Sequence, residues 1–210
     1  MPSRTAETPR RPSARAKLID AAHLLVRRQG YAATSVDEIC TTAGVTKGAF
    51  FYHFPSKEAL GAEAAEQWSA RANELIFTLP PWTRLPDPLD RLLAHIDFRA
   101  SLIDGPAESY TCFVGTMVQE SYASNEVLRR ASDASMTAYA MRLAEDIAAA
   151  IDKYGIKNDI TAISLAWHVQ AVLQGGFILA KARGEAAIAL ESVAHLKRYV
   201  EMLFKKEPRP

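Results

Sequence analysis

Side chains of the types that bind phosphate gather within a short stretch near the N-terminus. This group consists of Thr34, Ser35, Thr46, Lys47, Tyr52, His53 and Lys57. They surround the expected N-termini of two short helices, where unpaired backbone N–H groups also attract anions. Hydroxyl, imidazole and ammonium groups in this arrangement predict a surface that binds phosphates.

Two short helices joined by a tight turn would position these side chains. Ser35 begins the first helix with a capping box, and Gly44 ends it with the backbone freedom of a turn. Thr46 caps the second helix, expected over residues 47–53. This pattern predicts a helix-turn-helix, whose second helix can enter the major groove of DNA. Gly48 adds no bulk there, which allows close approach.

Two adjacent aromatic residues in the second helix should have different environments. One of Phe50 and Phe51 should pack inward, while the other can face the groove and touch a thymine methyl. Core packing is the expectation for Phe50, Tyr31 and Phe54. Phe51 is therefore the candidate for base contact.

The charge distribution also points to an anionic partner for the N-terminal part. Residues 1–57 carry nine Lys and Arg against four acids, whereas residues 58–210 carry sixteen against twenty. A net charge of +1 thus separates into a basic first quarter and an acidic remainder. An ordinary solvated surface would explain the excess equally well if the motif were absent.

Composition restricts the class of protein. With 210 residues, 49% hydrophobic and 23% charged, the chain is globular rather than disordered. Cys40 and Cys112 are too few for a disulfide framework and lack metal-site spacing, so neither a metal nor a cofactor is expected. A cytoplasmic location fits two free thiols and an N-terminus without the apolar run of a secretory signal.

One apolar stretch needs a separate interpretation. Residues 160–180 carry no charge and would be long enough to span a bilayer. They include Ser164, His168, Gln170 and Gln174, which hydrocarbon penalises. We therefore expect a helix buried in a soluble protein or its dimer interface, and no membrane association.

Helical periodicity runs through almost the whole chain, which predicts an all-α fold. Gly and Pro breaks divide it into about nine helices. The expected helices cover residues 13–29, 35–43, 47–53, 56–77, 88–104, 110–123, 125–154, 159–183 and 185–204.

The segments GYAATSVDEI (residues 30–39) and AGVTKGAFFYHFPSKEAL (residues 43–60) resemble the TetR family of transcriptional repressors. The resemblance implies a DNA-binding head, a homodimer that binds a palindromic operator, and a helical body that binds a small-molecule effector. It also implies that Thr34, Tyr52, His53 and Lys57 hold phosphates, while Lys47, Gly48 and Phe51 lie nearest the bases. Many members have Tyr or Trp where Phe51 stands, so recognition there would rest on apolar contact.

The expected organisation is a flexible basic tail (1–12), a helix-turn-helix DNA-binding domain (13–57), and an effector-binding and dimerisation domain (58–210). The last helix has apolar residues at alternating spacings of four and three, the seam of two packed helices. The resemblance assigns this seam to the dimer interface, although packing within one chain would give the same pattern. The expected interface residues are Gly175, Gly176, Ala189, Val193, Leu196, Val200 and Leu203.

The effector pocket should involve aromatic, soft or polar side chains on inward helix faces. The candidates are Trp68, Phe98, Tyr110, Cys112, Met117, Glu120, Tyr139, Trp167, Gln170 and Phe177. Residues 110–120 are similar to a segment in a subset of TetR regulators, some of which sense electrophiles or small unsaturated acids. Cys112 could therefore be an inert core residue, a pocket wall or a sensor thiol.

Two other classes of function compete with a ligand-responsive repressor. A thiol enzyme would use Cys112 with His95 or His168, but nucleophile, phosphate-loop and metal motifs are absent and the five histidines are scattered. A helical adaptor would bind proteins alone. An adaptor would lack salt-sensitive, sequence-dependent DNA binding, and a hydrolase would turn over a chromogenic ester.

Overall fold

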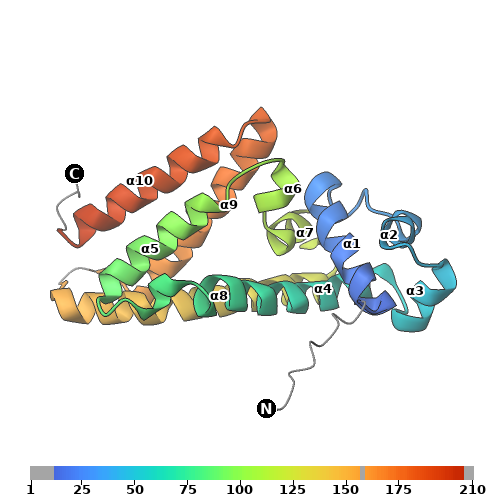
Figure 1. The fold of residues 1–210 in the computed structure, drawn as a ribbon, viewed down its shortest axis with the longest axis horizontal. Coiled ribbons are helices and arrows are strands. Elements are labelled where there is room, and N and C mark those ends of the chain that lie inside the picture. The colour runs from blue at the N-terminus through green and yellow to red at the C-terminus, as the bar shows by residue number, and fades with distance from the viewer. Residues whose placement is uncertain (1–11, 157–158, 206–210) are drawn as a thin grey trace, which may run out of the picture.

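The computed structural model describes residues 12–156 and 159–205, and all regular elements in these ranges are helical. This confirms the all-α prediction (Figure 1). The α-helices are α1 (Ala14–Gln29), α2 (Val36–Ala43), α3 (Lys47–His53), α4 (Lys57–Ala72), α5 (Pro88–Ser101), α6 (Ala107–Tyr110), α7 (Phe113–Ser121), α8 (Glu126–Tyr154), α9 (Ala162–Arg183) and α10 (Ala187–Leu203). A π-helix, η1 (Asn73–Thr78), extends α4, and a 3-10 helix, η2 (Pro81–Arg84), precedes α5.

Local capping determines where the head helices begin and end. The Ser35 hydroxyl and the Glu38 carboxylate satisfy each other's backbone amides at the start of α2. Gly44, with φ of +63°, donates its N–H to two carbonyls at the end of α2. The Thr46 hydroxyl then accepts from the Ala49 N–H at 3.1 Å and starts α3. The predicted capping box and glycine turn are therefore both confirmed.

The core of the head continues into the body. Phe50 and Phe54 are buried in one apolar cluster with Phe113 and Leu128, which belong to α7 and α8. α4 starts at Lys57, packs on α1 and then runs beside α8 (Figure 1). The division expected at residue 57 thus falls at a helix start inside a shared core. Most of the expected basic tail lies outside the described residues.

The body packs α5, α8, α9 and α10 around a second apolar core, at the opposite end of the long axis from the head (Figure 1). α9 has the length and mean hydropathy, 1.4, of a membrane span. However, Leu165, Val169, Leu173 and Phe177 bury one side of it in this core. α9 thus has the length and hydropathy of a membrane span, but one side of it packs in the protein core, as the sequence predicted.

The apolar seam of α10 packs within this single chain. Ala189, Val193, Leu196 and Val200 are buried within this single chain, where α10 packs on α9 and α5. A Cβ added to Gly176 would lie 3.3 Å from the Ala189 Cα, so this glycine permits the intramolecular crossing. These four side chains therefore have an intramolecular role that the sequence did not distinguish from pairing. Their assignment to the dimer interface stays a prediction.

The helix expected over residues 110–123 is divided in two. α6 ends at Tyr110, and Cys112 is the N-cap of α7, its sulfur accepting from the Gly115 N–H at 3.4 Å. The extended backbone of Thr111 separates the two helices. Cys112 therefore lies one residue before α7, whereas the sequence placed it in the first turn of a helix.

Candidate functional site

The outer face of α3 is the most exposed aromatic surface of the head. Phe50 is fully buried and anchors the helix, while Phe51 is 52% exposed and Tyr52 is 85% exposed. The core assignments of Phe50, Tyr31 and Phe54 are confirmed. Fixing one aromatic ring in the core aims its neighbours away from the protein.

Polar residues of the predicted surface border these rings. Ser35 and Thr46 are exposed caps at the starts of α2 and α3. The exposed Lys47 ammonium pairs with Asp37 at 2.9 Å, and the His53 ring packs edge-on against Tyr52. Gly48 is exposed, and a Cβ there would meet only the Thr46 hydroxyl oxygen, at 3.8 Å.

Thr34 and Lys57 have structural partners that the sequence did not predict. Thr34 is 1% exposed, and its hydroxyl donates to the Gly30 carbonyl at 2.7 Å. Phosphate contact by this side chain does not fit such a placement. The Lys57 ammonium donates to the carbonyls of Tyr31 and Thr34 at 3.1 and 3.0 Å and lies over the Tyr31 ring. Lys57 thus holds the turn between α1 and α2.

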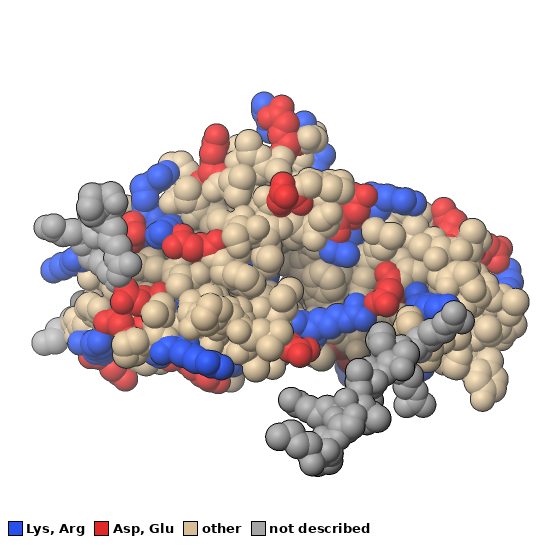
Figure 2. Space-filling view, viewed as in Figure 1, with Lys and Arg blue, Asp and Glu red and all other residues tan. Residues whose placement is uncertain are grey.

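The basic excess of residues 1–57 is divided between described and undescribed parts. Arg4, Arg10 and Arg11 precede the first described residue. On the face drawn in Figure 2, basic and acidic side chains are interspersed over the head and the body. The helix-turn-helix therefore supports DNA binding more strongly than the total charge does.

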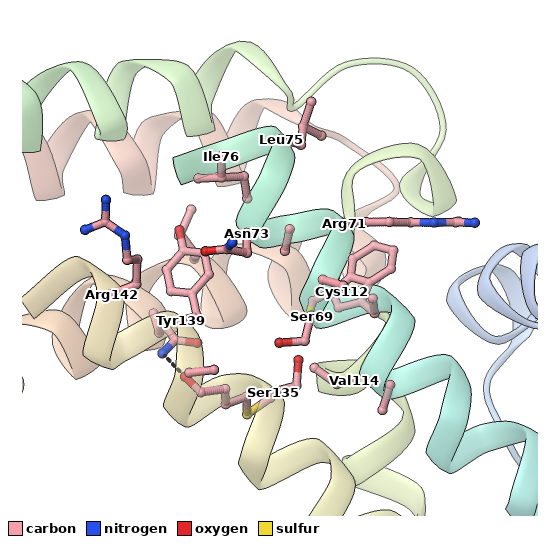
Figure 3. Close-up of a pocket in the computed structure, with 18 of the residues that line it drawn as sticks. Ser69, Arg71, Asn73, Leu75, Ile76, Cys112, Val114, Ser135, Tyr139 and Arg142 are labelled. Carbon is pink, nitrogen blue, oxygen red and sulfur yellow. Dashed lines mark hydrogen bonds between the residues drawn. The ribbon is translucent and has the colours of Figure 1, made fainter. Parts of the chain in front are cut away.

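A cavity of about 800 Å³ lies between α4 with η1, α5, α7, α8 and α9. Figure 3 shows Tyr139 and Arg142 toward one end and Cys112 toward the other, with Ser69 and Ser135 between them. The π-helix contributes Asn73, Leu75, Ile76 and Phe77, so a distorted end of α4 forms one wall. The volume of this cavity is typical of small-molecule sites. The predicted pocket residues that line it are Trp68, Tyr110, Cys112, Tyr139 and Gln170.

The other five predicted pocket residues lie elsewhere. Met117 is fully buried in the shared head core, Phe98 packs against the body core beside Trp82, and Trp167 is on the outer face of α9. Glu120 and Phe177 line a second cavity of about 330 Å³, which Cys112 also borders. Helical periodicity identified inward faces, but it does not distinguish a cavity from a packed core.

Sequence reasoning missed the four arginines of the large cavity, Arg27, Arg71, Arg99 and Arg142. The sequence could have indicated Arg99, because it lies on the same face of α5 as Leu92, His95 and Ile96. Those three residues are buried. Arg71 and Arg142 are paired with Asp20 and Glu145. A lone arginine on an inward face can indicate a polar group in an apolar cavity.

Cys112 has cationic neighbours that are remote in sequence. Burial lowers the pKa values of Arg27 and Lys181, while the Cys112 thiol acts on both in the opposite direction. All three line the second cavity. The fold therefore supplies the positive groups that the residues adjacent in sequence do not.

Glu120 joins the body to the head. Its carboxylate accepts from the Ala32 N–H at 2.6 Å, in the turn between α1 and α2. Gly30 in the same turn has φ of +93°, and a Cβ there would collide with the Glu120 carboxylate. The end of α7 therefore contacts the segment that leads into the helix-turn-helix.

Part of the outer surface of α9 and α10 is apolar although it faces solvent. Trp167 and Ile178 lie three helical turns apart on one side of α9, and Ile178 is 47% exposed. The exposed large apolar residues of these two helices are Ile163, Trp167, Ile178, Leu179, Leu190, Tyr199 and Met202. Contiguous apolar surface is a common feature of protein interaction sites.

Comparison with family models identifies two regions of the chain. Residues 18–64 match the model for bacterial regulatory proteins of the tetR family, and residues 88–196 match the tetracyclin repressor-like C-terminal domain. The transcriptional repressor DhaR of Mycobacterium sp. (strain GP1) is 26% identical over 119 residues, 57% of this chain and 58% of that protein. The regulator AcrR of Shigella flexneri is 39% identical over 86 residues, 39% of each chain. The matches span less than two thirds of these relatives.

Solved structures share the whole architecture. The reduced form of Escherichia coli NemR superposes with a TM-score of 0.73 at 22% identity, over 89% of this chain and 96% of that one. A TetR-family regulator from Agrobacterium tumefaciens gives 0.77 at 22% identity, with the same coverage. At these identities, the likeness establishes the fold.

Proposed function

Because the chain belongs to the TetR family of bacterial regulatory proteins, we propose that it is a cytoplasmic, homodimeric repressor released from a palindromic operator by a small molecule. The observation that carries the proposal is the combination of an exposed recognition helix, α3, with a large cavity in the attached body.

Gly48 gives the sharpest support for DNA contact by α3. Glycine inside a helix costs about 1 kcal/mol relative to alanine. The fold has room for a Cβ here, so packing does not require the glycine. A residue that costs stability without a structural reason fits a surface where DNA approaches the backbone closely. We assign Lys47, Gly48 and Phe51 to the bases, and Ser35, Thr46, Tyr52 and His53 to flanking phosphates.

The outer apolar face of α9 and α10 supports the proposed dimer. Pairing these helices across a two-fold axis would cover the exposed residues and present two α3 helices to one DNA molecule. Two linked contacts bind a palindromic site far more tightly than one. The buried side of α10 packs on α9 and α5 and so fixes the position of this outer face.

Release requires the effector to bind the DNA-free conformation more tightly than the DNA-bound one. Two connections lead from the cavity to the head. α4 forms a cavity wall and begins at Lys57, which holds the Tyr31 and Thr34 carbonyls. α7 follows its N-cap Cys112, which lies beside the cavity, and ends just after Glu120, which holds the Ala32 amide. A shift of either helix would change the separation of the two heads.

The observed contacts do not favour the thiol-enzyme alternative. His95 hydrogen-bonds to the Tyr139 hydroxyl at 2.8 Å, and the exposed His168 packs on Tyr199. Both rings thus have partners other than the Cys112 thiol. The adaptor alternative remains a matter for DNA-binding measurements.

The test is footprinting of the protein on the promoter region beside its own gene, followed by anisotropy titrations at several salt concentrations. Lys47→Ala should weaken operator binding and relax base preference, because it removes a side chain that we assign to the bases. Phe51→Ala should alter base preference while the slope changes little. Lys153→Ala, which removes a surface lysine paired with Asp87 in the body, is the matched control and should change neither property.

Binding without salt or sequence dependence would contradict the repressor proposal and favour an adaptor. Turnover of a chromogenic ester that disappears in Cys112→Ser would favour an enzyme. Unchanged affinity and base preference in Lys47→Ala would leave Lys47 with the Asp37 ion pair alone.

A further inference from the structure

The large cavity is mainly apolar but has an uneven charge. Its described lining contains four arginines and one acid, Glu66. Arg71 and Arg142 have carboxylate partners, and Arg27 donates to the carbonyls of His23 and Ser109. Arg99 is the exception.

Arg99 faces the cavity without a counter-ion. Among the described residues, no carboxylate oxygen lies within 4.0 Å of its guanidinium. Its Nε is buried without a hydrogen-bond partner, and its guanidinium carbon lies 5.7 Å from the centre of the Tyr139 ring. Arg99 as a whole is half-buried. A cation at the wall of an apolar cavity favours an anionic partner, because its partial desolvation is otherwise uncompensated.

Tyr139 places a second donor at the same end. The Nε2 of His95 lies 2.8 Å from the Tyr139 hydroxyl, while its Nδ1 is buried and unpartnered. Burial lowers the pKa of His95 to about 3, so the ring is neutral. A proton on Nδ1 would leave a buried N–H unpaired, which costs more than an unpaired acceptor. Nε2–H therefore donates to Tyr139, and the Tyr139 proton is free to donate into the cavity.

We propose that this cavity binds an apolar carboxylic acid, with its carboxylate at Arg99 and Tyr139 and its hydrocarbon part between α4 and α8. This inference rests on the proposed effector role of the cavity and names the chemical class of the effector. A guanidinium and a hydroxyl, both donors, fit a carboxylate. Ala72, Ile76, Ala134, Ala138 and Leu173 supply apolar walls for the rest of the molecule.

The test compares dodecanoate with dodecanol, which has the same chain length without the charge. Each displaces the fluorescent neutral probe N-phenylnaphthylamine from the full-length protein in the absence of DNA. Dodecanoate should displace the probe at a roughly tenfold lower concentration, because the alcohol cannot form the charge-assisted hydrogen bond. Failure of the probe to bind would overturn the proposal, since an open apolar cavity of this size should accept it.

Three variants locate the charge. Arg99→Met should raise the dodecanoate concentration roughly tenfold and leave dodecanol unchanged. Arg99→Lys should retain part of the preference because it keeps the charge. Arg142→Met, which removes an arginine already paired with Glu145, is the control and should change the preference less than about threefold. Equal weakening of both ligands by Arg99→Met would overturn the assignment.

A parallel titration of the protein–operator complex separates the two proposals. Arg99-dependent binding of dodecanoate without release of DNA would uphold the ligand class and contradict the release mechanism. Release by dodecanol at lower concentrations than dodecanoate would uphold the release mechanism and overturn the carboxylate inference.

Discussion

The two cysteines show how strongly the fold changes the chemistry of a residue type. Cys40 is buried in the head, and burial raises the pKa of its thiol. Cys112 is only partly buried, precedes α7 and lies on the walls of two cavities near Arg27 and Lys181. A thiol must be accessible and deprotonated to react, and both burial and the raised pKa slow Cys40.

We therefore expect iodoacetamide at neutral pH to label Cys112 at least about tenfold faster than Cys40 in the folded protein. Peptide mass spectrometry over time gives both rates from one sample. Denatured protein is the control, and there the two rates should converge. Faster labelling of Cys40 would show that access to Cys112 is closed. Loss of operator binding upon labelling would distinguish a sensor from a cavity wall.

Two buried histidines predict sensitivity to acid. Burial is the main cause that lowers the pKa of His23 to about 4 and that of His95 to about 3. In the unfolded chain both groups titrate near 6.5, so below this pH the unfolded state binds more protons than the native state. Acid therefore favours unfolding.

The free energy of unfolding should be highest above pH 6.5 and decrease toward pH 4.5, by at most about 2.7 kcal/mol per pH unit for two groups. Urea titrations at several pH values measure this slope. His23→Gln, which can still donate to the Ala64 carbonyl, should reduce the slope by about half. A profile that is flat over this interval would show that the rings are charged in the folded protein.

At the scale of the element, α3 combines a buried ring with an exposed face and an unexplained glycine. Gly48→Ala should raise the free energy of unfolding by about 0.5–1 kcal/mol, because alanine is the better helix former. The same change should weaken operator binding, because it adds a methyl group to the proposed DNA contact surface. Urea unfolding and anisotropy titration measure the two effects.

Gly155→Ala provides the opposite control. Gly155 has space for a Cβ but ends α8 with φ of +60°, so alanine there should destabilise the protein. Stabilisation by Gly48→Ala together with unchanged DNA affinity would remove Gly48 from the DNA contact surface.

Helix boundaries could be predicted from sequence because their causes are local. Ser35, Gly44 and Thr46 act within four residues of themselves. The role of α10 could not be predicted in this way, because the stripe through Val193 and Leu196 looks the same against a helix of the same chain or of a partner. The buried side of Thr34 and the cation neighbours of Cys112 likewise depend on segments that are distant in sequence.

At the scale of the whole molecule, the outer face of α9 should determine the oligomeric state. Trp167→Glu combined with Ile178→Glu should give a folded monomer in sedimentation, because both side chains are exposed on one side of the helix. Its circular dichroism should stay helical, while operator affinity should fall strongly because a monomer forgoes the linked second half-site.

Leu196→Glu is the informative comparison, because this side chain is buried inside the chain. Placing a charge there should destabilise folding by several kcal/mol and reduce helicity rather than produce a folded monomer. A folded, monomeric Leu196→Glu variant would support the interface expected from the sequence.

The contact between the α1–α2 turn and α7 has a consequence for the evolution of the family. Gly30 leaves the space that the Glu120 carboxylate fills, and Glu120 binds the amide two residues further along. A side chain at position 30 would therefore be selected against for two reasons, the collision with Glu120 and a φ of +93°. A small residue at 120 would remove the collision but not the backbone strain. Homologues should keep glycine at position 30 whatever residue they have at position 120, ninety residues away.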